Sequence, residues 1–165
     1  MPERTDPEQL RLASLSARDA DAASALHARC FERAWSPAEF RTFAGAFVYS
    51  GLLAWQGERL AGLLIVMTIG SETEILTLAV DPELRRQGVG EAILKRFLAE
   101  AAGIGVNAVF LEVGYRNGAA RALYEACGFE VVGERPGYYQ TPDGAEDAVI
   151  MKATLPVAIA AAAPD

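Results

Sequence analysis

Apolar and polar residues alternate with different periods along the first part of the chain. Residues 10–16 (LRLASLS) alternate one by one, which predicts a strand. Asp19 then opens an Ala-rich segment that predicts a helix running to about Phe31. Residues 36–39 (SPAE) form a capping box with proline at the first helical position, so a second helix is expected to begin there.

Three apolar segments of strand length follow. Gly57 separates residues 52–56 from residues 60–69, which is typical of a β-hairpin. Residues 74–80 (EILTLAV) come after the turn at Gly70-Ser71 and predict a further strand.

A third helix is predicted because apolar residues recur at helical spacing before Gly103 and Gly105, which end it. Its apolar face consists of Ile93, Leu94, Phe97, Leu98 and Ala101. Residues 108–113 (AVFLEV) are a short apolar run, which predicts a strand buried on both faces.

The last part of the chain predicts one more helix and two strands. The helix is expected from about Asn117 to Cys127, with Gly128 as its C-cap. Residues 129–134 and 147–153 are expected to be strands joined by a loop rich in Tyr, Pro and Gly.

This order predicts an α/β fold, with a mixed central sheet of about seven strands flanked by about four helices. No internal repeat or long linker divides the chain, so residues 1–156 are expected to form a single domain. Residues 157–165 are an Ala-rich tail that is expected to be disordered.

Composition narrows the functional classes. The 165 residues are 52% hydrophobic and 22% charged, which suits one globular domain with a sizeable core. The net charge of −7 argues against direct nucleic-acid binding and favours basic or amine-bearing partners, although much surface charge serves solubility.

The cysteines and the N-terminus bear on metals and location. Cys30, Cys127 and the single His27 do not make a plausible zinc set, so no metal is expected. Both cysteines are interpreted as small core residues in a reducing cytosol. The chain shows no signal peptide and no apolar run of the ~20 residues that a membrane span needs, so a cytoplasmic location is expected.

Residues 85–90 (RRQGVG) carry the first candidate chemistry. Glycines at a helix start allow close backbone approach, and the first helical N–H groups have no partners within the helix, which favours an anion. Arg85 and Arg86 add positive charge, so a phosphate or pyrophosphate is the expected guest. An ordinary strand-to-helix turn with solvated arginines is the alternative. Neither a P-loop nor a dinucleotide fingerprint fits, because Glu91 and Ile93 occupy positions that these motifs assign to other residues.

Two side chains suggest proton transfer. Glu112 is the only carboxylate between Val106 and Asn117, on a strand otherwise suited to burial. Burying a carboxylate is costly unless it is solvated or paired, and burial is one way to tune a general base. Asn117 and Tyr124 are about two helical turns apart and therefore lie on one helix face. A strand-end glutamate reaching solvent and a core tyrosine are the alternatives.

The ordered set of motifs resembles the GNAT family of acyl-CoA N-acyltransferases over nearly the whole chain. The motifs are a strand ending AVDP, RRQGVG opening a helix, a further strand, and N-x-x-A-x-x-LYE-x-x-GF. This resemblance implies that the loop holds the pyrophosphate of acetyl-CoA, the cosubstrate, and that no metal is required.

A finer resemblance is to the RimI type, which acetylates the N-terminal alanine of a ribosomal protein. It is carried by AWS (34–36), LEV (111–113), NGAARALYEACGF (117–129), YY (138–139) and DGAEDAVIM (143–151). It implies that Glu112 is the general base and Tyr124 the general acid. The implied cofactor-binding residues are Leu78, Ala79, Val80, Arg85, Arg86, Gln87, Gly88, Val89, Gly90, Glu91 and Asn117. Trp35, Tyr138 and Tyr139 are the implied substrate-binding residues.

The implied partner is the basic N-terminal peptide of a ribosomal protein, and the enzyme itself is expected to be a monomer. The chain departs from the RimI-type pattern at one place that is expected to border the bound peptide. After LEV the RimI type tends to carry Arg, a small residue, Ser and Asn, whereas this chain has residues 114–117 (GYRN). Two alternatives stay open: a GNAT enzyme acting on small amines or lysine side chains, and a non-catalytic acyl-CoA sensing module.

Overall fold

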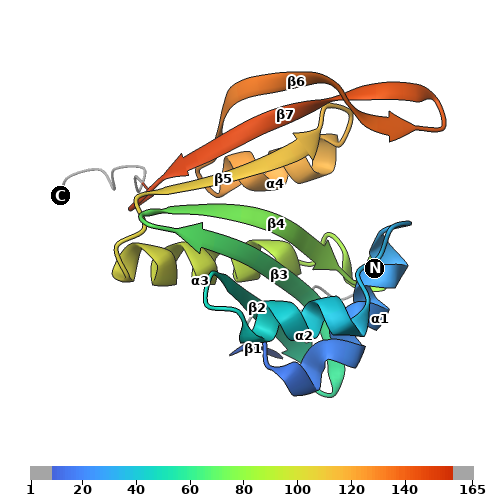
Figure 1. Cartoon of the computed structure of the whole chain (residues 1–165), viewed down its shortest axis with the longest axis vertical. Helices are drawn as coiled ribbons and strands as arrows, with labels where there is room; N and C mark the ends of the chain where they lie inside the picture. Colours follow the sequence, from blue (N-terminus) through green and yellow to red (C-terminus); the bar gives the residue numbers. More distant parts are fainter. Residues whose placement is uncertain (1–8, 158–165) are drawn as a thin grey trace. The chain divides into compact units, whose positions relative to one another are not determined.

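The structure, a computed structural model, describes residues 9–157 (Figure 1). The strands are β1 (Leu10–Ser14), β2 (Tyr49–Gln56), β3 (Arg59–Ile69), β4 (Glu72–Val80), β5 (Ala108–Gly114), β6 (Glu130–Thr141) and β7 (Gly144–Thr154). The α-helices are α1 (Ala20–Cys30), α2 (Pro37–Gly45), α3 (Val89–Gly103) and α4 (Gly118–Ala126), with short 3-10 turns η2 (Ala17–Asp19) and η3 (Pro82–Leu84). The predicted order of elements is confirmed.

The strands pair in the order β1-β2-β3-β4-β5-β7-β6 and form a seven-stranded sheet. β4 and β5 pair in parallel, whereas β1–β2, β2–β3, β5–β7 and β6–β7 are antiparallel. The predicted α/β class with a mixed sheet and four helices is therefore confirmed. The described chain divides into two compact units: a first unit of residues 9–69 and 75–97, and a second unit of residues 70–74 and 98–157.

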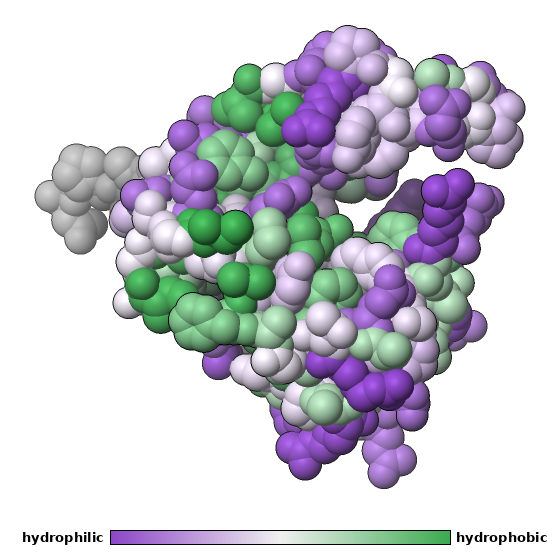
Figure 2. Space-filling view, in the orientation of Figure 1, coloured by the Kyte–Doolittle hydropathy of each residue, from purple (hydrophilic) through white to green (hydrophobic). Residues whose placement is uncertain are grey.

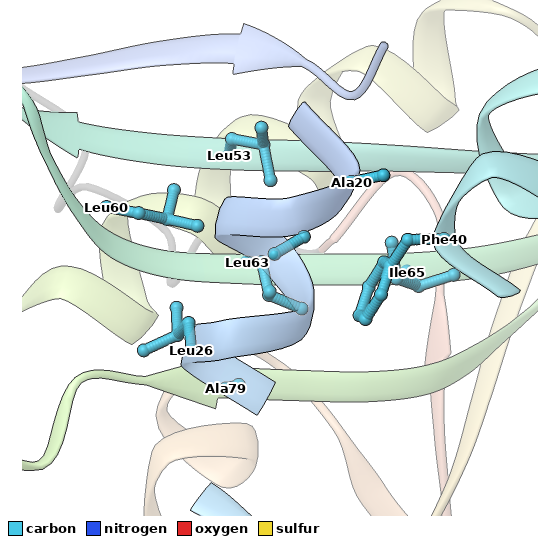
Figure 3. Close-up of a cluster of buried hydrophobic side chains, with 9 residues drawn as sticks. Ala20, Leu26, Phe40, Leu53, Leu60, Leu63, Ile65 and Ala79 are labelled. Carbon is cyan, nitrogen blue, oxygen red and sulfur yellow. The ribbon is translucent and has the colours of Figure 1, made fainter. Parts of the chain in front are cut away.

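In the first unit, helices cover both faces of β3, which explains why most of this strand is buried. Leu63 and Ile65 join a buried cluster with α1 and α2 (Figure 3). Gly62 lies on the opposite face, where an added Cβ would approach Ile93 of α3 within 2.8 Å. Because successive side chains of a strand point to opposite faces, the two faces of β3 bury against different helices.

The start of α2 follows the sequence prediction. Ser36 Oγ accepts a hydrogen bond from the Glu39 N–H at 3.2 Å, and a Glu39 carboxylate oxygen accepts one from the Ser36 N–H at 2.7 Å. Both bonds of the predicted capping box are therefore present.

In the second unit, β7 lies between β5 and β6, and Figure 1 shows α4 running alongside these strands. Asn117 is the N-cap of α4, and its side-chain oxygen accepts from the Ala120 N–H at 3.2 Å. Gly128 has a φ of 97°, the left-handed conformation that glycine adopts readily at a helix C-terminus.

Two predictions about the second unit were wrong. β5 is not buried on both faces: Val109, Leu111 and Val113 are buried, but Phe110 and Glu112 on the other face are only half-buried. The Lys152 ammonium lies 5.5 Å from the centre of the Phe110 ring, so a long charged side chain covers part of this face.

The predicted Tyr-, Pro- and Gly-rich loop is the continuation of a β-hairpin. β6 runs to Thr141 and β7 begins at Gly144. The register shifts between Arg135 and Tyr139, so a bulge accommodates the proline and glycine that suggested a loop.

Within residues 9–157, no helix combines the length and the apolar character needed to cross a membrane. Cys127 is buried, as predicted, but Cys30 is only half-buried. The predicted tail, residues 157–165, lies outside the described residues apart from Val157.

Candidate active site

The predicted pyrophosphate loop leads into α3 in the first unit. The first hydrogen bond of the helix runs from the Ala92 N–H to the Gly88 carbonyl at 3.0 Å, so the N–H groups of residues 89–91 have no partner one turn earlier. Gly88 has a φ of 87°, and open space surrounds the position that a Cβ would take. Arg86 also has a positive φ, 63°, which is unfavourable for a residue with a Cβ. The loop thus presents free amides and exposed arginines, a suitable cradle for an anion.

A buried carboxylate anchors this loop to the sheet. Asp81, 1% exposed, accepts hydrogen bonds from Arg29 Nη1 at 2.9 Å and from Arg59 Nη2 at 2.8 Å. Burial alone would raise the pKa of Asp81, but hydrogen bonds from the Glu83 N–H, Arg59 and Arg29 outweigh it and lower the pKa. Sequence reasoning missed this network; the Asp-Pro pair before η3 signals a cap, but nothing local signals the two arginines.

The end of β4 offers backbone rather than side chains. Ala79 is buried in the cluster of Figure 3, so its side chain is committed to the core. Leu78 and Val80 are half-buried. The Val80 carbonyl already accepts from Arg85 Nε at 3.3 Å and from Cys30 Sγ at 3.4 Å.

Trp35 lies between α1 and α2 in the first unit and is half-buried. Its ring stacks on the His27 imidazole with centroids 4.7 Å apart and packs against Phe43 at 4.8 Å. The predicted substrate residue therefore has one ring face committed to the protein.

In the second unit, Glu112 is paired rather than alone. Arg135 Nε lies 3.0 Å from a Glu112 carboxylate oxygen, and the Glu112 side chain is 20% exposed. The Arg135 guanidinium also lies 5.4 Å from the centre of the Tyr138 ring. Sequence reasoning missed Arg135, because only the strand order β5-β7-β6 brings it near Glu112.

Tyr124 is buried on α4, and its ring packs edge-on against Phe129 with centroids 5.6 Å apart. Burial, reinforced by Tyr139 and Cys127, raises the pKa of Tyr124 to about 12. The phenol therefore keeps its proton at neutral pH and can act as a donor.

Tyr139 links these side chains into one neighbourhood. Burial is the main cause that raises the pKa of Tyr139. The nearby Glu112, Tyr138 and Glu146 raise this pKa further, in decreasing order. Tyr139 also raises the pKa of Tyr124, so this predicted substrate residue interacts electrostatically with both the predicted base and the predicted acid.

The divergent turn after β5 is held by the β6–β7 hairpin. Glu146 accepts a hydrogen bond from the Arg116 N–H at 2.6 Å. A Cβ at Gly114 would lie 2.9 Å from the same carboxylate, so a larger residue there would displace the Glu146 side chain. Tyr115 is exposed, and the Arg121 guanidinium lies 5.2 Å from the centre of its ring.

Residues 20–129 match the model of the acetyltransferase (GNAT) family. The chain belongs to the GNAT family. The family resemblance read from the motifs is thus confirmed.

One group of acetyltransferases is similar to this chain in both sequence and structure. The chain is 36% identical over 148 residues to the "[Ribosomal protein bS18]-alanine N-acetyltransferase" of Escherichia coli K12, covering 90% of this chain and 98% of that protein. The crystal structure of the ribosomal-protein-S18-alanine N-acetyltransferase from E. coli superposes with a TM-score of 0.83 at 33% identity, covering 94% of this chain and 99% of that one.

Arabidopsis thaliana NAA60 in complex with acetyl-CoA shares the fold, with a TM-score of 0.77 at 18% identity over 88% of this chain and 98% of that one.

Among the residues that the structure describes, no group of three His, Cys, Asp or Glu side chains could hold a metal ion.

Proposed function

We propose that this chain transfers the acetyl group of acetyl-CoA to the N-terminal α-amine of a ribosomal protein, with alanine as the first residue. The observation that carries the proposal is the 36% identity to the E. coli bS18-alanine N-acetyltransferase over 90% of the chain. We further propose that the enzyme is a monomer that acts in the cytoplasm on a basic N-terminal peptide.

The first unit would hold the cosubstrate. Free amides at the start of α3, together with Arg85 and Arg86, suit the pyrophosphate of acetyl-CoA. The backbone of residues 78–80 would bind the pantetheine arm, and Asn117 in the second unit would also contact the cosubstrate. Acetyl-CoA supplies an acetyl thioester that an uncharged amine can attack.

Glu112 would accept the proton that the amine must lose. A free α-amine has a pKa near 8, so its deprotonation costs little at neutral pH. The carboxylate need only receive the proton, directly or through water, while the amine is held in position. As the nitrogen–carbon bond forms and the carbon–sulfur bond breaks, Tyr124 would donate the proton of its phenol to the sulfur.

The β6–β7 hairpin would border the peptide, with Tyr138 and Tyr139 there and Trp35 in the first unit as contacts. Residues 129–152 carry five carboxylates (Glu130, Glu134, Asp143, Glu146 and Asp147) against Arg135 and Lys152, a net charge of 2 − 5 = −3. On the face in Figure 2, the tip of this hairpin is mostly hydrophilic. Glu146 and Asp147 also accept hydrogen bonds from the Arg116 and Gly137 N–H groups, which fixes them in place. The net negative charge of residues 129–152 would attract a basic peptide.

Mass spectrometry of acetylated products tests the proposal. The purified protein is given acetyl-CoA with a peptide that starts with alanine followed by basic residues, an N-terminally blocked lysine peptide, or a polyamine. We expect fast acetylation of the first peptide at its α-amine. Preferred acetylation of the polyamine or of the lysine side chain would replace the proposed substrate. If coenzyme A is not released in the presence of any of these amines, the non-catalytic acyl-CoA sensing module is favoured.

A further inference from the structure

Two side chains of α1 hold both backbone polar atoms of Trp35. The Trp35 N–H donates to His27 Nδ1 at 3.0 Å, and the Trp35 carbonyl accepts from Ser24 Oγ at 2.8 Å. The His27 and Trp35 rings are nearly parallel, with an interplanar angle of 10°. Ser24 and His27 are one helical turn apart, so one face of α1 forms this Trp35 clamp.

The hydrogen bonds fix the state of the imidazole. Because Nδ1 accepts from the Trp35 N–H, the proton of the neutral ring lies on Nε2, which faces Thr77 Oγ1 of β4 at 3.2 Å. His27 is 3% exposed and also packs against the rings of Phe31 and Phe40. A second proton would have to sit on Nδ1, opposite the N–H of Trp35, and would break this bond.

Burial lowers the pKa of His27, and the nearby charge of Glu39 on α2 opposes this only partly. Glu39 is the charged group that acts on the ring from α2, while α1, β4 and the Trp35 segment contribute the uncharged Ser24, Thr77 and Trp35 to its surroundings. The clamp is therefore closed at neutral pH, and protonation of the imidazole would open it.

Trp35 immediately precedes Ser36, the N-cap of α2. Holding its backbone consequently fixes the direction in which the chain enters α2 and the side of the indole left for a ligand. Phe40 and Phe43 of α2 contact the indole ring, so α2 and the clamp position it together.

We propose that His27 is a positioning residue for substrate recognition: it holds Trp35 in the conformation that receives the first residues of the acceptor peptide and releases it when the imidazole is protonated. This inference rests on the proposed function, because it takes Trp35 as a peptide contact.

A matched pair of variants tests the acceptor. Asparagine and leucine have the same branched arrangement of side-chain heavy atoms, and both remove the imidazole ring, but only His27→Asn keeps an oxygen able to accept from the Trp35 N–H. We expect His27→Leu to raise the KM for the peptide about fivefold above that of His27→Asn, the equivalent of about 1 kcal/mol for one hydrogen bond. The KM for acetyl-CoA should be equal in the two variants. Equal peptide KM values in the two variants would overturn the proposal.

The pH profile is a second readout. In the natural protein the peptide KM should rise as pH falls through the lowered pKa of His27, which lies below the ordinary histidine value of about 6.5, whereas His27→Asn should lack this rise. A rise of equal size in both proteins would assign it to another group and overturn the role of His27.

A measurement without substrate separates this inference from the proposed function. Hydrogen exchange and the NMR shift of the Trp35 backbone amide are followed from pH 8 to pH 5 in the free protein. Protection is the intrinsic exchange rate at each pH divided by the observed rate. We expect the protection of this amide to fall in acid in the natural protein, to be low at all pH values in His27→Leu, and to stay high in His27→Asn. An amide unaffected by His27→Leu would overturn the clamp even if the acetylation assay succeeds. An amide that responds as expected would support the clamp even if alanine peptides are not acetylated.

Discussion

The two aromatic surfaces predicted to meet the acceptor peptide are built in different ways. In the first unit, α1 fixes the backbone of Trp35 on both sides, and its ring packs against His27, Phe40 and Phe43. In the second unit, Tyr138 is 50% exposed on a hairpin whose register is irregular between Arg135 and Tyr139.

The difference lies in what holds each ring. Uncharged hydrogen bonds and stacking hold Trp35, which makes that surface rigid while His27 is neutral. Tyr138 and Tyr139 are surrounded by charges instead: Arg135 lies over Tyr138, and Glu112 and Glu146 act on Tyr139. We therefore expect the first surface to respond to packing and to the charge of His27, and the second to ionic strength and to carboxylate changes.

The largest effect on kcat should follow from replacing Glu112, beside the second surface, with an uncharged residue. Glu112→Gln removes the proposed base, and proton transfer by a positioned side chain contributes about 10²–10⁴-fold to rate. We expect kcat to fall by about that factor, with activity recovering toward high pH, where the amine loses its proton unaided. Glu125→Gln, an exposed carboxylate on α4, is the control and should keep its rate. Stopped assays from pH 6 to pH 10 measure both, and a flat profile in Glu112→Gln would contradict the base assignment.

Removing the phenol of Tyr124 should cost less. A thiol has a pKa near 8.5, so the leaving sulfur is stable enough to depart without full protonation. We expect Tyr124→Phe to lower kcat by about 10²-fold, the lower end for proton transfer, with acetyl-CoA affinity nearly unchanged and no recovery at high pH.

The buried ring of Tyr124 makes phenylalanine a fair test, since only the hydroxyl is lost. Tyr49→Phe, a tyrosine of the first unit in edge contact with Phe43, serves as the control for a general effect of losing a phenol. If kcat of Tyr124→Phe stays close to that of the natural protein, Tyr124 is a packing residue and Glu112 and positioning account for the rate.

Of the substitutions proposed in this Discussion, only the one in the loop of residues 85–90 should weaken acetyl-CoA binding. A ligand at 100 times its dissociation constant stabilises the folded protein by about 2.7 kcal/mol. Gly88→Val should abolish this stabilisation, because valine cannot adopt a φ of 87° without strain and the loop must change shape.

The control is Gly57→Val in the β2–β3 turn. Gly57 has a φ of 61° and, like Gly88, open space where a Cβ would lie, so it carries a similar backbone strain away from the loop. Thermal unfolding with and without acetyl-CoA should show the ligand-induced rise in Gly57→Val but not in Gly88→Val. A normal rise in a folded Gly88→Val protein would remove this loop from the acetyl-CoA site.

These features differ in how far the sequence predicted them. The capping box of Ser36, the turn at Gly57 and the glycine loop before α3 are local patterns, and each was found where expected. The order of elements along the chain and the family were also predicted, because the motifs occur in a fixed sequence along the chain.

What the sequence did not predict depends on contacts between distant residues. The arginine partners of Asp81 and the histidine partner of Thr77 are 22 to 52 residues away, and no local pattern pairs them. The hairpin was mistaken for a loop because Pro136 and Gly137 usually interrupt strands, whereas the bulge absorbs them here. The ion pair of Glu112 with Arg135 depends on that same bulged strand.

Ionic strength should distinguish the two surfaces with a smaller effect. Attraction between exposed charges is screened at high salt, with a Debye length of about 10 Å at 0.1 M and about 3 Å at 1 M. The KM of a basic peptide should therefore rise several-fold over this range if the acidic hairpin attracts it. A peptide with glutamine in place of its basic residues should show no such rise. If both peptides respond alike, the charge of the hairpin plays no part in recognition.

The smallest effect concerns the stability of the first surface in acid. Burial lowers the pKa of His27 below its ordinary value near 6.5. Above pH 6.5 the ring is neutral in both the folded and the unfolded chain, so its contribution to stability is constant there. As pH falls from 6.5 through the lowered pKa of the folded state, the unfolded chain takes up a proton that the folded chain resists, and stability is lost.

His27→Asn has no such proton to take up, so the natural protein should lose more of its melting temperature than the variant between pH 6.5 and pH 5. In a chain of this size each kcal/mol moves the melting temperature by about 2–4 °C, which makes a modest difference measurable. The lowered pKa of Asp81 acts at lower pH, below the ordinary aspartate range, and affects both proteins equally. Parallel curves for the two proteins in this window would show that His27 titrates freely, and the rigidity of the Trp35 surface would then have to come from stacking and Ser24 alone.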